Sequence, residues 1–387
     1  MEEFDGQEQH GRPRMVVLAG PNGSGKSTVT KGLMEDPHFP KDRYVNADDI
    51  AKRLEQPILD AETRREYAKA IQPNMPELPL LGKVWYMGSR MSEEQIATEL
   101  ERGVSNVDMR NGFAAILAEN TRKTELGLGH DFAFETVMST QGKLAMFDEA
   151  HSKGYDVDMV FVTTEHSSIN QQRVLNRVAQ GGHAVDPEKI AERYNRAMHM
   201  LPAALERVDT ASVYDNSHKE PVLIAKKENG VITYPPVNME DPGQQKAVRD
   251  FQGNLREKVE NRQHDFDALT ENFANRTNKP IERSSVEQGS ESYGRIVSIT
   301  DHHVLQYDRE NEKYVAHDRT LMTPGVIPNL QKAMEEGRDV TVAYNYGSDS
   351  KLTDQSKTLD KTLIGSKELD QYLFDPSSRE EPKPRQM

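Results

Sequence analysis

Residues 16–34 read VVLAGPNGSGKSTVTKGLM, in which an apolar run, a glycine-rich turn and a helical pattern follow one another directly. Gly20, Gly25, Lys26 and Ser27 satisfy G-x-x-x-x-G-K-[ST], the P-loop pattern, in the strand–turn–helix context that it requires. We expect Lys26 to reach the β- and γ-phosphates of a nucleotide and Ser27 to ligate Mg²⁺. A glycine turn with a surface lysine is the alternative, and the four matched positions weigh against it. The predicted nucleotide-binding residues are Gly20, Asn22, Gly23, Ser24, Gly25, Lys26, Ser27 and Thr28.

Apolar runs and helical patterns alternate through the first 235 residues. This order predicts an α/β fold of the P-loop kinase type, in which a doubly wound parallel sheet carries a helical insertion and a lid. The insertion occupies about residues 57–130 and contains KVWYMGSRM. The runs that we predict to be strands are 14–20, 43–46, 130–140, 156–164 and 211–217.

The composition excludes several classes of protein. A net charge of -14 over 387 residues argues against general nucleic-acid binding, which needs a basic surface. No apolar run approaches the roughly 20 residues of a membrane span, and the acidic start MEEFDGQEQHGRPR lacks the features of a signal peptide. Because the chain has no cysteine, it also fits a reducing compartment. We therefore expect a cytoplasmic protein that does not bind membranes.

A kinase also needs a base for the attacking hydroxyl and cations for the transferred phosphoryl group. Asp48 lies near the end of the second predicted strand, at the sheet edge where α/β folds bind ligands. Asp48 is equally well explained as the N-cap of the helix that begins DIAKRL, with Asp49 as the competing cap. Arginines at 173, 177, 193 and 196 flank the glycine-bearing stretch AQGGHAVDP, an arrangement that favours a mobile lid over solvated helix faces.

Five blocks occur in order along the chain: GPNGSGKST, VNADDIAKRL, FAFETVMS, RVLNRVAQGGHAVDPEKIAERYNRA and VYDNS. Together they resemble the zeta-toxin family, the kinase half of epsilon/zeta toxin–antitoxin systems, over roughly residues 14 to 220. The resemblance implies an ATP-dependent kinase, with GTP as an alternative nucleotide. Its implied acceptor is a sugar hydroxyl of UDP-N-acetylglucosamine or a similar nucleotide sugar, and its implied effect is inhibition of bacterial growth.

The resemblance also implies roles for individual residues. Asp48 becomes the base, and Lys26, Arg173 and Arg177 complete the catalytic set, while Asn216 borders the adenine. The implied substrate-binding residues are Asp49, Glu135, Thr136, His183 and Arg193. From the residues alone, Glu135 is better explained as a strand-end carboxylate that caps the next helix, and Asn216 as a turn residue. Since the insertion departs from the family pattern, NAD remains an alternative acceptor.

After residue 235 the sequence becomes more charged and then changes to short alternating β runs. The stretch YGRIVSITDHHVLQYDRENEKYVAHDRTLM resembles a KfrB-like domain of conjugative plasmid proteins. We interpret His302 and His303 as a pair at a strand start, and give His317 the same structural reading. The predicted divisions are a flexible N-terminus (1–13), a kinase domain (14–235), a charged helix with a linker (236–291), a small β-rich domain (292–347) and a polar tail (348–387).

Two further expectations concern partners. The acidic N-terminus is too short for a fused three-helix antitoxin, so inhibition would come from a separate antitoxin or from the C-terminal region. A plasmid-transfer interaction protein that uses the P-loop as a nucleotide switch is the alternative from another class. The acidic charge balance weighs against that alternative.

Overall fold

The computed structural model describes residues 11–29, 31–73, 91–179, 186–274, 277, 279–284, 290–322 and 325–344. The chain divides into two compact units, of which the first contains Met1–His264 and the second contains Asp265–Ser284 with Glu291–Ala343. Predictions for KVWYMG in the insertion, for His183 and for the C-terminal tail fall outside the described residues.

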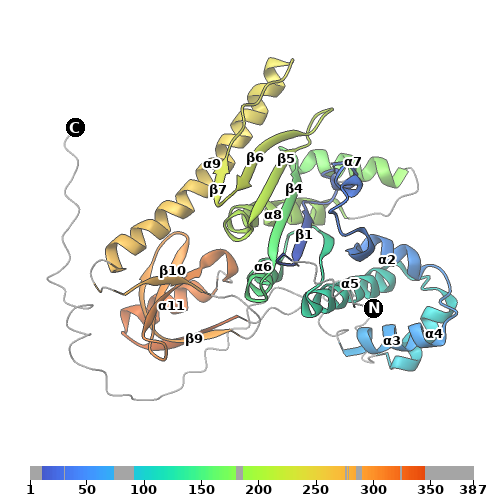
Figure 1. Ribbon diagram of the computed structural model, residues 1–387, viewed down its shortest axis with the longest axis horizontal. Helices are drawn as coiled ribbons and strands as arrows, with labels where there is room; N and C mark the ends of the chain where they lie inside the picture. Colours follow the sequence, from blue (N-terminus) through green and yellow to red (C-terminus); the bar gives the residue numbers. More distant parts are fainter. Residues whose placement is uncertain are drawn as a thin grey trace, which may run out of the picture. The chain divides into compact units, whose positions relative to one another are not determined.

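A seven-stranded sheet forms the centre of the first unit, in the order β2-β3-β1-β4-β5-β6-β7 (Figure 1). The first five strands of this order pair in parallel, so the predicted doubly wound sheet is confirmed. The sequence interpretation ended the sheet at β5 and missed two antiparallel strands beyond it. The strands are β1 (Arg14–Ala19), β2 (Tyr44–Val45), β3 (Phe132–Thr136), β4 (Asp156–Thr163), β5 (Thr210–Asp215), β6 (Val222–Glu228) and β7 (Val231–Thr233).

Helices fill the connections between the strands. They are α1 (Lys26–Val29), α2 (Ala47–Leu54), α3 (Ala61–Ile71), α4 (Glu93–Arg102), α5 (Val107–Leu128), α6 (Gly142–Ser152), α7 (Ser167–Ala179), α8 (Pro187–Arg207) and α9 (Pro242–Leu269). The helix predicted over 26–34 is shorter, because α1 ends at Val29 and a separate 3-10 turn covers Leu33–Glu35. Pro187 occupies the first turn of α8, the helical position at which proline is favoured.

The predicted helical insertion is a small layer with its own core. Leu54, Ile71, Leu100 and Phe113 come from α2, α3, α4 and α5 and are fully buried in one cluster. Side chains of Asp60, Ser92 and Asn106 accept hydrogen bonds from the first turns of α3, α4 and α5. These N-caps explain why each helix begins where it does.

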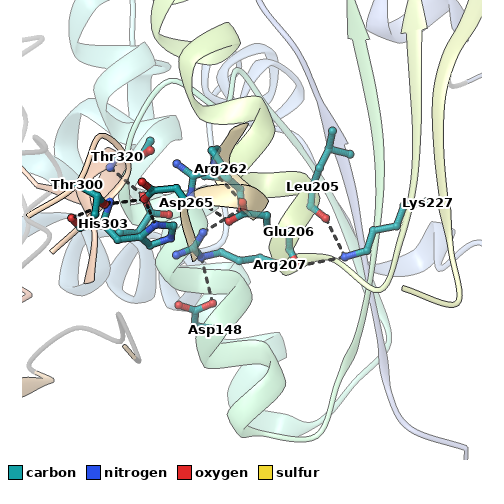
Figure 2. A network of polar contacts seen from close by, with 12 residues as sticks. Asp148, Leu205, Glu206, Arg207, Lys227, Arg262, Asp265, Thr300, His303 and Thr320 are labelled. Carbon is teal, nitrogen blue, oxygen red and sulfur yellow. Dashed lines mark hydrogen bonds and ion pairs between the residues drawn. The ribbon is translucent and has the colours of Figure 1, made fainter. Parts of the chain in front are cut away.

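The C-terminal end of α8 is held by buried charged groups (Figure 2). Lys227 Nζ on β6 lies 2.8, 3.1 and 2.7 Å from the carbonyl oxygens of Leu205, Glu206 and Val208. The ammonium therefore satisfies carbonyls that the helix leaves without an intrahelical donor. The Glu206 carboxylate accepts two 3.0 Å hydrogen bonds from Arg262 of α9, and Arg207 pairs with Asp148 of α6 at 3.4 Å.

A five-stranded sheet in the order β12-β9-β10-β11-β8 forms the second unit. The predicted DREN turn joins β10 to β11, and Asp308 Oδ1 accepts backbone hydrogen bonds at 2.9 and 3.1 Å inside it. The sequence interpretation missed β8, which lies in the predicted linker, and a helix before the last strand. The elements are β8 (Ile281–Arg283), β9 (Glu291–Ile299), β10 (His303–Asp308), β11 (Lys313–Asp318), α11 (Val326–Glu335) and β12 (Asp339–Ala343).

Among the described residues, no helix is both long enough and apolar enough to cross a bilayer.

Candidate active site

The predicted site residues of the first unit follow the carboxyl ends of parallel strands. Gly20 follows β1, Asp48 follows β2, Glu135 lies at the end of β3, and Asn216 follows β5. Because parallel strands end at the same edge of a sheet, these positions share one edge, where open α/β folds bind ligands. Backbone hydrogen bonds tie the edge together, from Gly20 N to Thr136 O at 3.1 Å and from Asn216 N to Thr163 O at 2.8 Å.

The P-loop turn depends on glycine at two points. Gly20 has φ 141°, and a Cβ there would lie 2.0 Å from the Val162 carbonyl oxygen. Gly25 has φ 88°, and a Cβ there would lie 2.2 Å from Asn216 Nδ2. That amide donates a 2.8 Å hydrogen bond to the Ser24 carbonyl oxygen, so Asn216 supports the loop from behind. Only glycine permits both the backbone conformation and this close approach.

Lys26 lies folded over its own loop. Its Nζ donates hydrogen bonds to the carbonyl oxygens of Gly20 at 2.8 Å and Pro21 at 3.2 Å, and lies 3.5 Å from Glu135 Oε1. Burial lowers the pKa of Lys26, and the Arg177 guanidinium acts in the same direction, while Glu135 and Asp48 oppose both. One buried ammonium thus interacts with two carboxylates and a guanidinium. The sequence had predicted all four groups for the site.

Glu135 is held by two donors on its other oxygen. Tyr44 Oη donates to Glu135 Oε2 at 3.1 Å, and Asn46 Nδ2 donates to the same oxygen at 3.2 Å. Burial, reinforced by the Glu135 charge, raises the pKa of Tyr44, so the phenol keeps its proton and remains a donor. Glu135 therefore does not act as a helix cap, and α6 begins at Gly142 after the N-cap residue Gln141, which makes no side-chain capping hydrogen bond.

Asp48 and Asp49 lie in the first turn of α2, and neither is its N-cap. The cap is Asn46, whose Oδ1 accepts a 2.9 Å hydrogen bond from Asp48 N. Asp49 pairs with Lys52 on the same helix at 3.5 Å. The exposed Asp48 carboxylate is left without a capping role, and its charge acts on Lys26. This arrangement suits a group that must accept a proton from an incoming hydroxyl.

Helices α7 and α8 carry the predicted arginines, and Arg173 on α7 reaches the loop. On α7, Arg173 reaches the Ser24 carbonyl oxygen at 3.5 Å and that of Ser217 at 3.4 Å. Arg177 is exposed one turn further along and acts electrostatically on Lys26. On α8, Arg196 pairs with Glu192 at 2.8 Å, as expected of a solvated helix face, and Arg193 is half-buried beside it.

Three supporting residues escaped the sequence interpretation. Asn170 Nδ2 donates to the Asn22 carbonyl oxygen at 2.8 Å, and Tyr44 and Asn46 hold Glu135. Asn46 had a usable signal, because asparagine directly before a helix is a preferred N-cap. Thr136, predicted to bind substrate, accepts a 3.2 Å hydrogen bond from Met138 N and so shapes the turn after β3.

Two buried histidines of the second unit lie within hydrogen-bond distance of neighbouring side chains. His317 Nε2 lies 2.9 Å from Gln306 Oε1, and His303, the first residue of β10, lies 2.7 Å from Asp265. The prediction of a histidine at a strand start is confirmed for His303. In the part of the chain that the structure describes, no group of three or more His, Asp or Glu side chains forms a metal site.

Residues 96–228 match the family described as Zeta toxin, and residues 291–350 match the KfrB domain. Both resemblances inferred from the sequence are thereby confirmed. The zeta-toxin match includes Glu135, Arg173, Arg177 and Asn216, whereas the P-loop and Asp48 precede it. Among the curated proteins, none matches this chain significantly.

Several solved structures are similar to the chain at low identity. The PezAT chromosomal toxin–antitoxin system of Streptococcus pneumoniae shows 12% identity over 66% of this chain and 91% of that chain, with a TM-score of 0.36. The native AvrRxo1-ORF1:-ORF2 complex shows 11% identity over 63% and 76%, with a TM-score of 0.34. A putative kinase from Chloroflexus aurantiacus shows 15% identity over 47% and 76%, with a TM-score of 0.28. These values are too low to carry an argument about function.

Proposed function

We propose that this chain, a kinase whose residues 96–228 match the zeta toxins, uses ATP to phosphorylate a sugar hydroxyl of UDP-N-acetylglucosamine or a similar nucleotide sugar. The observation that carries the kinase chemistry is the grouping around Lys26. A P-loop ammonium 3.5 Å from Glu135 interacts with the exposed carboxylate of Asp48 and with Arg177. Nucleotide cradle, base and cations therefore share one sheet edge. The family match supports the acceptor class.

In the proposed reaction, the triphosphate of ATP occupies the P-loop and draws Lys26 away from the Gly20 and Pro21 carbonyls. Asp48 accepts the proton of the acceptor hydroxyl as its oxygen attacks the γ-phosphorus. The bond between that phosphorus and the β,γ-bridging oxygen breaks, and ADP leaves with the negative charge. Lys26, Arg173 and Arg177 stabilise the charge on the transferred group.

Magnesium fits this site as a companion of the nucleotide. Mg²⁺ keeps several waters and is usually held by one or two protein oxygens together with substrate phosphates. Ser27 is exposed directly after Lys26, where its hydroxyl is free to serve as such a ligand. Because Mg²⁺ in such sites is held largely by substrate phosphates, the ion would arrive with ATP. It would neutralise charge on the β- and γ-phosphates.

The proposal extends to regulation of growth. A zeta-toxin-type kinase that consumes a cell-wall precursor inhibits growth unless it is restrained, so we propose a separate antitoxin as its partner. Inhibition by the C-terminal region is the alternative. Co-expression of the full chain with and without its neighbouring genes, scored by colony formation, distinguishes the two. Growth without any partner would favour inhibition from within the chain.

The acceptor is tested by mass spectrometry. The purified chain is incubated with Mg²⁺, with ATP or GTP, and with UDP-sugars, NAD or nucleosides in separate reactions. We expect added phosphate on a UDP-sugar, and no product with Lys26→Ala, which should also bind ATP weakly and permit growth. If NAD alone gains phosphate, NAD replaces the nucleotide sugar as the acceptor. ATP turnover stimulated by DNA without any phosphorylated small molecule would contradict the kinase proposal in favour of a nucleotide switch.

A further inference from the structure

Asn46 uses both ends of one carboxamide at the candidate active site. Its Oδ1 accepts the hydrogen bond of Asp48 N at 2.9 Å, and its Nδ2 donates to Glu135 Oε2 at 3.2 Å. The same Nδ2 lies 3.3 Å from Tyr44 Oη, which itself donates to Glu135 Oε2. A single side chain therefore joins the first turn of α2 to the carboxylate that pairs with Lys26.

Strand geometry explains why these residues meet. Tyr44 pairs with Ala133 and Val45 pairs with Phe134 in the parallel register of β2 and β3. Extending this register by one residue places Asn46 beside Glu135. Alternate residues of a strand face the same side, so Tyr44 and Asn46 both point toward that carboxylate. The buried Val45 points to the opposite face.

An N-cap alone does not need this arrangement. Serine, aspartate and asparagine cap helices about equally well, because each offers a side-chain oxygen to the first backbone N–H groups. Only asparagine among these three also offers an N–H donor that a neighbouring carboxylate can accept. Capping of α2 requires only the Oδ1 acceptor of Asn46, so its Nδ2 donor has another role.

We propose that Asn46, assisted by Tyr44, is a positioning residue for phosphoryl transfer. It fixes the turn that carries Asp48 relative to Glu135, and it keeps Glu135 bound to neutral donors so that Lys26 is released to the incoming phosphates. This inference rests on the proposed function, since Asp48 is taken as the base. Tyr44 donates to Glu135 and accepts from Asn46, whereas Asn46 bonds both Glu135 and the first turn of α2.

The two residues therefore predict different kinetic effects. Without either donor, Glu135 competes more strongly for Lys26, so Mg·ATP should bind about 3- to 10-fold more weakly, the effect of losing one ordinary intramolecular hydrogen bond. Loss of the link to α2 should also lower kcat, by about 10-fold or more, because small displacements of a base are costly. Tyr44→Phe should then change ATP affinity alone. Asn46→Ser should change both ATP affinity and kcat.

The test compares Asn46→Ser, Asn46→Ala and Tyr44→Phe in the full chain, with Mg·ATP affinity from calorimetry and kcat from ATP turnover. Asn46→Ser retains the cap, so it should be more thermally stable than Asn46→Ala, while kcat and affinity fall as in Asn46→Ala. If Asn46→Ser restores wild-type kcat and affinity, the residue is only a helix cap and the proposal is wrong.

A double-mutant cycle with Glu135→Gln keeps the test independent of the acceptor. In the Glu135→Gln background, Asn46→Ser should leave the Mg·ATP dissociation constant unchanged, because the competing carboxylate is gone. If the losses of Mg·ATP affinity in Asn46→Ser and Glu135→Gln simply add in the double variant, Asn46 does not act through Glu135. If wild-type protein turns over no acceptor at all, the proposed kinase function fails. The coupling measured on ATP affinity still decides whether Asn46 acts through Glu135.

Discussion

Lys26 in the first unit and His317 in the second are both buried basic side chains, and burial lowers the pKa of both. Their surroundings differ. Lys26 lies among groups that carry charge, with Glu135 at 3.5 Å and Asp48 and Arg177 acting over longer range. His317 bonds the neutral Gln306 at 2.9 Å and lies 3.3 Å from Ser292, and its pKa is lowered to about 3 by burial, which outweighs Asp308.

The difference teaches that a perturbed pKa alone does not identify a functional site. Partners of Lys26 are exchangeable, because phosphate oxygens can replace the Gly20 and Pro21 carbonyls. Gln306, the partner of His317, donates its amide hydrogen bonds to the carbonyl oxygens of Gly294 and Val340 at 3.2 and 2.8 Å. This closed network stabilises the sheet. The open charged group near an exposed Asp48 is suited to chemistry.

The largest expected effect concerns the charged surroundings of Lys26. Asp48→Asn removes the proposed base but keeps the side-chain size, so kcat should fall about 100- to 10,000-fold, the usual contribution of a general base. Mg·ATP affinity should stay close to wild type. Asp49→Asn changes the adjacent carboxylate, which pairs with Lys52 on the helix surface, and should keep kcat, with a raised KM if Asp49 also binds the acceptor. If Asp48→Asn keeps full activity and Asp49→Asn is inactive, Asp49 is the base and Asp48 is not.

A second change tests whether the loop is as constrained as its contacts indicate. Gly25→Ala places a Cβ 2.2 Å from Asn216 Nδ2 at a residue with φ 88°. Strain of about 1–3 kcal/mol should weaken Mg·ATP binding by roughly 10-fold or more, measured by calorimetry. Gly129→Ala is the control, because its φ of 74° carries similar strain but nothing lies within 4 Å. It should lower thermal stability and leave ATP affinity intact.

The sequence predicted those parts of the fold that depend on local pattern. Apolar runs marked β1 to β5, of which β1, β2 and β5 are followed directly by glycine or asparagine, and the P-loop pattern marked the nucleotide site. It missed β6 and β7 because β7 (Val231–Thr233) has only three residues, two of them exposed, and β6 changes from the apolar run VLIA to the charged run KKE without a strand period. It missed β8 for a similar reason, since three residues with two exposed side chains carry no periodic signal.

The site was predictable as residue types and not as contacts. Lys26, Asp48 and Glu135 were identified by motif or resemblance, and the structure brings them together. The competing cap reading of Asp48 was wrong, since Asn46 is the cap. Whether a residue caps a helix or bonds a distant carboxylate depends on the register of β2 against β3, a tertiary fact that single-residue preferences do not contain. Asn216 likewise became a loop support only through its place after β5.

The buried surroundings of His317 predict that stability depends on pH. His317 stays neutral in the folded protein, with a pKa of about 3 against an ordinary 6.5, so the unfolded chain binds one more proton between these values. The contribution of His317 to stability is therefore fully present above about pH 6.5 and is lost as the pH drops toward 3, by up to about 1.4 kcal/mol for each pH unit. Urea unfolding followed by a brief exchange pulse at one fixed pH, read on peptides of residues 303–318, measures this slope.

Matched variants isolate the histidine in that experiment. His317→Gln should lower the starting stability, because it disturbs the bond to Gln306, and should also reduce the slope below pH 6.5. His302→Gln changes a neighbouring histidine that is half-buried, and the slope should match that of wild type. An unchanged slope in His317→Gln would mean that His317 is already protonated in the folded sheet. His317 would then carry a positive charge in the folded protein, as Lys26 does, although its hydrogen-bond partner is neutral.

The smallest effect distinguishes two roles of Asn216, nucleotide contact and loop support. Asn216→Ala removes one 2.8 Å hydrogen bond to the Ser24 carbonyl, a loss that usually costs about 0.5–1.5 kcal/mol. If Asn216 only supports the P-loop, affinity for ATP, GTP and inorganic tripolyphosphate should fall by the same factor, about 2- to 10-fold, because all three bind through phosphates. A loss confined to ATP would instead assign Asn216 to the adenine. The P-loop would then rely on Arg173 and Asn170 for its support from behind.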